Sequence, residues 1–170
     1  IFFASLRRTT MNKIVIIIPS RLNARRLPNK PLKLINNKEM ILHVYDSAAK
    51  SSAGEVYVAT PDQKIVDIVK NFGGNAIKTS DNHETGTDRI FEVFKETLNS
   101  EPNIIINLQG DMPNLEPQAI SNLVSYMNKN KCDIGTLASD FSSKIEIDNP
   151  NIVKVAVKEK LSNDIFLNAL

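Results

Sequence analysis

Two groups of charged side chains have the types and spacing to bind a ligand that carries phosphates. Four cations, Arg21, Arg25, Arg26 and Lys30, follow directly on an apolar run, and Asp111 follows a second apolar run. Cations neutralise phosphate oxygens, and one carboxylate can hold Mg²⁺ against them, because Mg²⁺ takes its other ligands from water and phosphate. These residues predict a polyphosphate site with Asp111 as the magnesium ligand.

The apolar runs are typical of buried strands. Residues 14–18 are five branched apolar residues without polar alternation, and residues 103–108 are similarly apolar, so both favour strands covered on two faces. The carboxyl ends of parallel strands meet at one edge of an open α/β sheet, where such sheets bind ligands. We therefore expect Arg21, Lys30 and Asp111 to face one another across the ligand.

Ordinary explanations exist for the same residues. The basic stretch also fits a solvated connection, and charge counting alone favours that explanation slightly. A lone aspartate after a strand is more often a turn or cap residue.

The rest of the chain alternates further strand and helix patterns. We expect a helix at 40–49, a strand at 55–60, and a second helix ending at Gly73 with Thr60 as its N-cap. Thr87 is expected to cap a third helix reaching Leu98, and a fourth helix spans 116–130. Strands are predicted at 133–138 and 152–157. This alternation predicts the α/β class, with a mostly parallel sheet and helices on both faces.

Composition excludes several classes of partner. The 170 residues hold 21 basic and 19 acidic side chains, and two of the basic ones, Arg7 and Arg8, precede Met11. The balanced remainder argues against nucleic-acid or membrane binding. The single cysteine, Cys132, excludes an internal disulfide and is predicted to be a small buried filler. No apolar run is as long as a membrane span, so we expect a cytoplasmic protein.

Several blocks resemble one enzyme family, the 3-deoxy-manno-octulosonate cytidylyltransferases, or CMP-Kdo synthetases, of lipopolysaccharide biosynthesis. The resemblance runs in order from about Met11 to Val157, and it rests mainly on Ile18-Pro19-Ser20-Arg21, residues 26–32, His83 to Arg89, Asn107-Leu108-Gln109-Gly110-Asp111, and Asn149 to Val155.

This resemblance implies a Rossmann-like nucleotidyltransferase (nucleotide-diphospho-sugar transferase) fold and a reaction. The expected enzyme transfers a cytidylyl group from CTP to 3-deoxy-manno-octulosonate (Kdo), giving CMP-Kdo and pyrophosphate. Arg21 and Lys30 are the expected catalytic cations and Arg26 assists them, while Asp111 holds Mg²⁺. Gln109, Gly110 and Arg89 are expected to contact substrate, although Arg89 is equally explained as a first-turn helix charge. His83 is not among the predicted contacts.

The resemblance also implies departures and alternatives. Family members run on well past Leu170 and are expected to be homodimers, so residues 11–170 are expected to be an incomplete domain that lacks its C-terminal part. Residues 1–10 are expected to be a leader or read-through outside the fold. Met112 stands where an acidic residue is usual, and Asn168 where an arginine is expected. Alternatives are a truncated, non-catalytic nucleotide-binding remnant and a transferase for another acidic sugar, such as N-acylneuraminate. A purely structural domain leaves the clustered charges unexplained.

Overall fold

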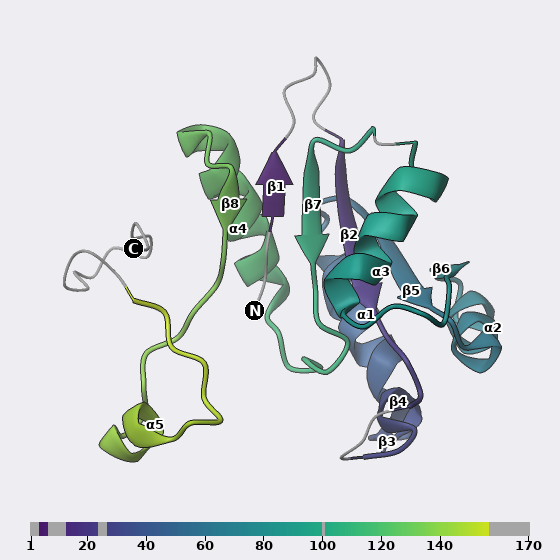
Figure 1. Cartoon of the computed structure of the whole chain (residues 1–170), viewed down its shortest axis with the longest axis horizontal. Coiled ribbons are helices and arrows are strands. Elements are labelled where there is room, and N and C mark those ends of the chain that lie inside the picture. Colours follow the sequence, from purple (N-terminus) through teal and green to yellow (C-terminus); the bar gives the residue numbers. More distant parts are fainter. Residues whose placement is uncertain (1–3, 7–12, 24–26, 100, 157–170) are drawn as a thin grey trace. The chain divides into compact units, whose positions relative to one another are not determined.

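The computed structural model describes residues 4–6, 13–23, 27–99 and 101–156. The chain divides into two compact units, 1–137 and 138–170, and the first contains the sheet. Its strands follow the order β6-β5-β2-β7-β1-β8 (Figure 1). In the second unit the described residues form one short helix, α5 (Lys144–Asp148).

Four neighbouring strands of the sheet are parallel: β2 (Ile14–Pro19), β5 (Glu55–Thr60), β6 (Asn75–Lys78) and β7 (Ile104–Asn107). β2 lies between β5 and β7, so that Ile16 is opposite Val56 on one side and Ile106 on the other. The predicted mostly parallel sheet is confirmed.

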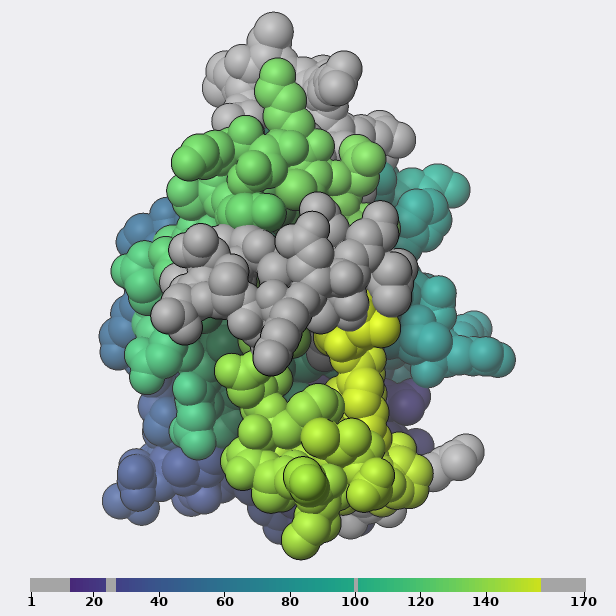
Figure 2. Space-filling view, turned by 90° about the vertical axis from the view of Figure 1, so that its left-hand side faces the viewer, coloured from purple at the N-terminus to yellow at the C-terminus, as the bar shows by residue number. Residues whose placement is uncertain are grey.

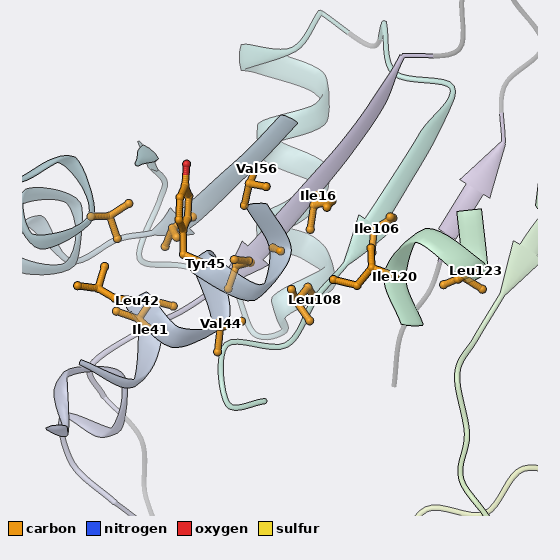
Figure 3. Close-up of a cluster of buried hydrophobic side chains, with 14 of the residues drawn as sticks. Ile16, Ile41, Leu42, Val44, Tyr45, Val56, Ile106, Leu108, Ile120 and Leu123 are labelled. Atoms are coloured by element: carbon orange, nitrogen blue, oxygen red, sulfur yellow. The ribbon is translucent and has the colours of Figure 1, made fainter. Parts of the chain in front are cut away.

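Strand β2 is buried on both faces, as its unbroken apolar run predicts. Ile16 and Ile18 pack with α1 (Met40–Lys50), α2 (Gln63–Asn71) and α4 (Pro117–Asn130) in the main core, part of which Figure 3 shows. Val15 and Ile17 point the other way, toward α3 (Gly86–Glu92) and the wider π-type turn η2 (Val93–Thr97). Helices thus cover both faces of the sheet.

Helix α4 shows the expected division between a buried and an exposed side. Ile120, Leu123 and Met127 are fully buried, whereas Gln118 and Lys129 are exposed. Its outer side belongs to the green surface in Figure 2.

In the described part of the chain, no helix has the length and apolarity that crossing a bilayer requires.

The N-terminal segment does not behave wholly as predicted. Three of the residues expected to lie outside the fold form strand β1 (Ala4–Leu6), which pairs antiparallel with β7 on one side and with β8 (Ile134–Gly135) on the other. The exclusion of residues 1–10 is therefore wrong for these three. The physical reason is that the outer edge of β7 carries backbone groups that need hydrogen-bond partners.

Two helix starts differ from the prediction. Helix α2 begins at Gln63 with Asp62 as N-cap, because Thr60 still pairs with Lys78 in the sheet. Helix α3 begins at Gly86, and its N-cap is Thr85 rather than Thr87. The Thr85 hydroxyl accepts from the Asp88 N–H and the Asp88 carboxylate accepts from the Thr85 N–H, each at 3.1 Å. This reciprocal capping box requires an acid three residues after the cap.

Smaller elements complete the comparison. Asn36 and Asn37, with φ of 48° and 62°, form the turn between β3 (Leu34–Ile35) and β4 (Lys38–Glu39). The strand predicted at 133–138 shortens to β8, and the one predicted at 152–157 is absent over 152–156, while Val157 lies outside the described residues. The short helix η1 spans Lys30–Leu32. Cys132 is half-buried against the main core.

Replacing Ile16, which is fully buried, tests whether β2 anchors the sheet. Ile16→Ala removes packing on the main core face and should lower the free energy of unfolding by about 2–5 kcal/mol. Leu34→Ala is the control because Leu34 is 63% exposed, and it should change this free energy by less than about 0.5 kcal/mol. Urea titration followed by circular dichroism measures both. Equal effects of the two variants would contradict the assignment.

Candidate functional site

Three loops converge on Pro19 at the carboxyl end of β2. A Cβ on Gly110, in the loop after β7, would lie 3.0 Å from the Pro19 carbonyl oxygen, and one on Gly86 would lie 3.1 Å from Pro19 Cγ. Both glycines therefore allow an approach that a larger residue would obstruct. Gly110, a predicted substrate contact, is at least a packing residue that brings Gln109 and Asp111 close to β2.

Lys30 and Asp111 meet directly. Lys30 Nζ lies 2.7 Å from Asp111 Oδ2, and the side chains are 36% and 52% exposed. Lys30 begins the short helix η1, whose preceding residue Asn29 has a φ of 55° and donates its N–H to the Leu22 carbonyl at 3.1 Å. The loop after β2 thus folds back on itself and presents Lys30 to the loop after β7. The sequence predicts that these groups face each other with a ligand between them, whereas here they are in direct contact.

A pocket of about 150 Å³ lies at the same edge of the sheet, and neither Lys30 nor Asp111 is among the residues that line it. Three of the predicted residues, Arg21, Arg89 and Gln109, are in its wall. The other lining residues are Pro19, Ser20, His83, Thr85 and Gly86. The Ser20 hydroxyl is buried and has no hydrogen-bond partner among the described residues. A buried hydroxyl without a partner is costly, so this atom favours a polar ligand in the pocket.

The pocket holds two guanidinium groups near each other. Arg21 is exposed, whereas Arg89 is 3% exposed and donates from Nη1 to the Ser80 carbonyl at 2.9 Å and to the Thr79 hydroxyl. Burial lowers the pKa of Arg89, and the positive charge of Arg21 lowers it further, while Glu92 and two aspartates oppose the shift. Since arginine stays charged at neutral pH, the arrangement attracts anions.

The magnesium prediction can be compared with the carboxylates that the structure describes. No group of three or more histidine, cysteine, aspartate or glutamate side chains able to hold a metal occurs in the described ranges. Asp111 is a single, accessible carboxylate, which suits an ion that takes its remaining ligands from water and phosphate. Met112, at the position where an acid is usual, packs against the main core instead.

Two of the predicted cations cannot be placed. Arg26, the expected assistant of Arg21 and Lys30, lies outside the described residues, as does Arg25. Asn168 also falls outside them. Each remains a prediction from the sequence.

Comparison with known proteins decides the family. The cytidylyltransferase family profile matches residues 15–168, which is most of the chain. The chain belongs to the cytidylyltransferase family. The match confirms the resemblance seen in the sequence, and it includes every predicted site residue.

Relatives of this cytidylyltransferase chain include two curated 3-deoxy-manno-octulosonate cytidylyltransferases. The one from Thermodesulfovibrio yellowstonii is 43% identical over 147 residues, covering 83% of this chain and 58% of the relative. That from Photobacterium profundum is 40% identical over 142 residues, covering 84% and 57%. The chain therefore spans somewhat less than three fifths of the length of these relatives.

A solved structure supports the fold. A CMP:2-keto-3-deoxy-manno-octonic acid synthetase, determined in complex with CTP, is 44% identical and superposes with a TM-score of 0.66, covering 71% of this chain and 49% of its own. Together with the sheet order, this likeness confirms the α/β nucleotidyltransferase fold.

Five lining residues of this cytidylyltransferase chain are not among the predicted contacts, and three of them, Ser20, His83 and Thr85, have polar side chains. Ser20 and Thr85 were noted only as members of motifs, and His83 was left out of the predicted contacts. The available signal was position: Ser20 adjoins Arg21 at a strand end, and Thr85 opens a capping box. The sequence does not show which side chains point toward the pocket.

The Asp88 carboxylate caps α3 beside the pocket and gives a pH prediction. Hydrogen bonds from the Thr85 hydroxyl and N–H lower the pKa of Asp88 below its ordinary value of 3.8. A lowered folded-state pKa contributes stability above pH 4, which is lost as pH falls through the folded pKa. Asp88→Asn should therefore destabilise the protein most at neutral pH, and the difference should shrink below about pH 4.

Urea unfolding from pH 7 to pH 2.5 measures this difference. Asp67→Asn is the control, because Asp67 lies on exposed α2 surface and caps no helix. A destabilisation by Asp88→Asn that stays constant over the whole range would contradict the capping role of the charge.

Proposed function

We propose that this chain transfers a cytidylyl group from CTP to Kdo, releasing pyrophosphate and forming CMP-Kdo for lipopolysaccharide biosynthesis. The observation that carries the proposal is the meeting of Lys30 and Asp111 at the same sheet edge as a pocket lined by Arg21 and Arg89. The relatives named as Kdo cytidylyltransferases and the solved relative with CTP support the choice of substrates.

The Lys30–Asp111 contact is suited to opening for a nucleotide. Both side chains are partly exposed, and exposed ion pairs contribute at most about 1 kcal/mol. A triphosphate would take Lys30 as its cation, while Asp111 would hold Mg²⁺. Each charged group thus gains a new partner of opposite charge when the original contact opens. When bound, Mg²⁺ would add positive charge against the phosphate oxygens.

The chain's own residues supply the rest by positioning and charge. The Kdo hydroxyl attacks the α-phosphorus and gives up its proton to water, the bond from that phosphorus to the bridging oxygen breaks, and pyrophosphate leaves. Charge spreads over the phosphoryl oxygens in such transfers, so fixed cations such as Arg21 and Lys30 stabilise the transition state. Arg26 assists in the same role. Arg89, Gln109, Gly110 and the unpartnered Ser20 hydroxyl contact the nucleoside or the sugar.

Location and assembly complete the proposal. We place the reaction in the cytoplasm, where CTP is available, and expect the chain to act as a homodimer as its family resemblance implies. Sedimentation equilibrium measures the assembly directly, and a monomer at all concentrations would refute the dimer.

Two measurements on the same chain test the reaction. Calorimetry with CTP and Mg²⁺ should detect binding, and a coupled assay should detect pyrophosphate when Kdo is added. Binding without pyrophosphate release, with Kdo or N-acylneuraminate, would support a non-catalytic nucleotide-binding chain. Turnover with N-acylneuraminate alone would change the sugar, and absence of CTP binding would overturn the proposal.

Removing the loop cations should slow the reaction strongly. Arg21→Ala and Lys30→Ala should each lower kcat/KM by on the order of 10²-fold, because each takes away a charge that faces the transferring phosphates. Lys33→Ala is the matched control: Lys33 is exposed and follows η1 directly, so it removes the same charge from the same loop. A tenfold or greater loss in the control would show a general charge effect instead.

The Asp111 carboxylate should govern the magnesium requirement. Asp111→Asn should weaken the activation by Mg²⁺ by on the order of 10-fold or more, because the carboxylate charge is the ligand that this ion prefers. The free energy of unfolding should change by no more than about 1 kcal/mol, since the ion pair is exposed. Magnesium titrations of initial rate and of CTP binding give the first quantity, and urea unfolding gives the second. An unchanged Mg²⁺ dependence would exclude Asp111 as a ligand.

A further inference from the structure

Segment 79–83 leads from the sheet to the pocket, and two side chains of α3 hold it. Arg89 Nη1 donates to the Ser80 carbonyl at 2.9 Å, while both carboxylate oxygens of Glu92 accept from the Ser80 N–H at 3.1 Å. Residues three apart lie on the same side of a helix, so Arg89 and Glu92 of α3 can bind the Ser80 carbonyl and the Ser80 N–H at the same time.

The Glu92 carboxylate also contacts the His83 side chain through Nε2. A carboxylate accepts hydrogen bonds and does not donate them, so a hydrogen bond in this contact requires a proton on Nε2, and Nδ1 is the other polar atom of the ring. The imidazole lines the same pocket as Arg21, Arg89 and Gln109. Both members of the His83–Glu92 pair are 20% exposed, so the contact is largely shielded from water.

We propose that Glu92 is a positioning residue for the pocket: by holding the Ser80 N–H and His83 Nε2–H, it fixes the imidazole and the guanidinium that form one wall. Glu92 itself is not among the residues that line this pocket, so it acts through its neighbours. The choice of CTP as the ligand rests on the proposed function, whereas the positioning of His83 and Ser80 does not.

Charge as well as geometry supports this role. Burial lowers the pKa of Arg89, and the nearby Glu92 carboxylate acts in the opposite direction. Glu92 therefore compensates a buried cation while ordering the segment that this cation binds. A small displacement of groups that orient a substrate can reduce binding or rate strongly, which makes an indirect contact of this kind measurable.

The sharpest test is Glu92→Gln, which keeps the size of the side chain but removes its charge and one acceptor oxygen. Glu96→Gln is the matched control, because it removes the same charge four residues later and Glu96 has no hydrogen bond to segment 79–83 among the described residues. Glu92→Asp keeps the charge on a shorter stem and should give an intermediate result.

Three readouts separate positioning from general stability. Glu92→Gln should weaken CTP binding by roughly 10-fold in calorimetry, as expected for losing hydrogen bonds to a charged group. Nitrogen NMR should show that His83 loses its fixed Nε2–H tautomer. The Ser80 amide should exchange its hydrogen at least several-fold faster, while Glu96→Gln leaves all three values close to wild type.

Each outcome decides the inference. A Glu92→Gln variant with wild-type His83 tautomer, Ser80 exchange and CTP affinity would overturn it, even if its melting temperature fell. If Glu92→Gln does not fold, Glu92→Asp supplies the same three readouts. If the wild-type chain fails to bind CTP, the proposed function falls, but the tautomer and the Ser80 amide still decide whether Glu92 holds the wall.

Discussion

Burial of β2 on both faces is the constraint on which the rest of this structure depends. Ile16 and Ile18 are fixed by one helical layer and Val15 and Ile17 by the other, so Pro19 has little freedom to move. The loops that begin at the ends of β2 and β7, and the loop before α3, all pack around this point. Because β2 is packed on both faces, the loops around its carboxyl end hold the site residues in fixed positions relative to it.

The loops around Pro19 bring together polar groups whose proximity or burial is unfavourable in a stable core. Two guanidiniums lie near each other and a hydroxyl is buried without a partner among the described residues. Both features cost free energy in the absence of a ligand. Proteins tolerate such local conflicts mainly at functional sites, where a bound molecule of opposite charge resolves them. Here the conflicts lie at the sheet edge where α/β folds bind ligands.

Much of this architecture could be predicted from the sequence because its signals are local. The unbroken apolar run before Pro19 predicts a doubly buried strand, and glycines after Phe72 predict the end of a helix. Charge and spacing also predicted that Lys30 and Asp111 would lie at the same sheet edge, although the two are in direct contact rather than separated by the width of a ligand. Strand order and helix starts were harder to predict, because they depend on pairing between segments that are distant in the sequence. Thr60 looks like a cap in the sequence but remains in the sheet, where its partner is Lys78.

One prediction was wrong, and another left two alternatives open that the structure shows to be compatible. Ala4–Leu6 precede the region matched by the family, so a resemblance gives no information about them, and the open edge of β7 decides their structure. Arg89 was weighed as either a nucleotide contact or an ordinary helix charge, yet its guanidinium binds segment 79–83 through one nitrogen and still lines the pocket. These alternatives are not exclusive. A guanidinium has several donors in a rigid plane, so one residue can order the wall of a site and also present charge to whatever the site binds.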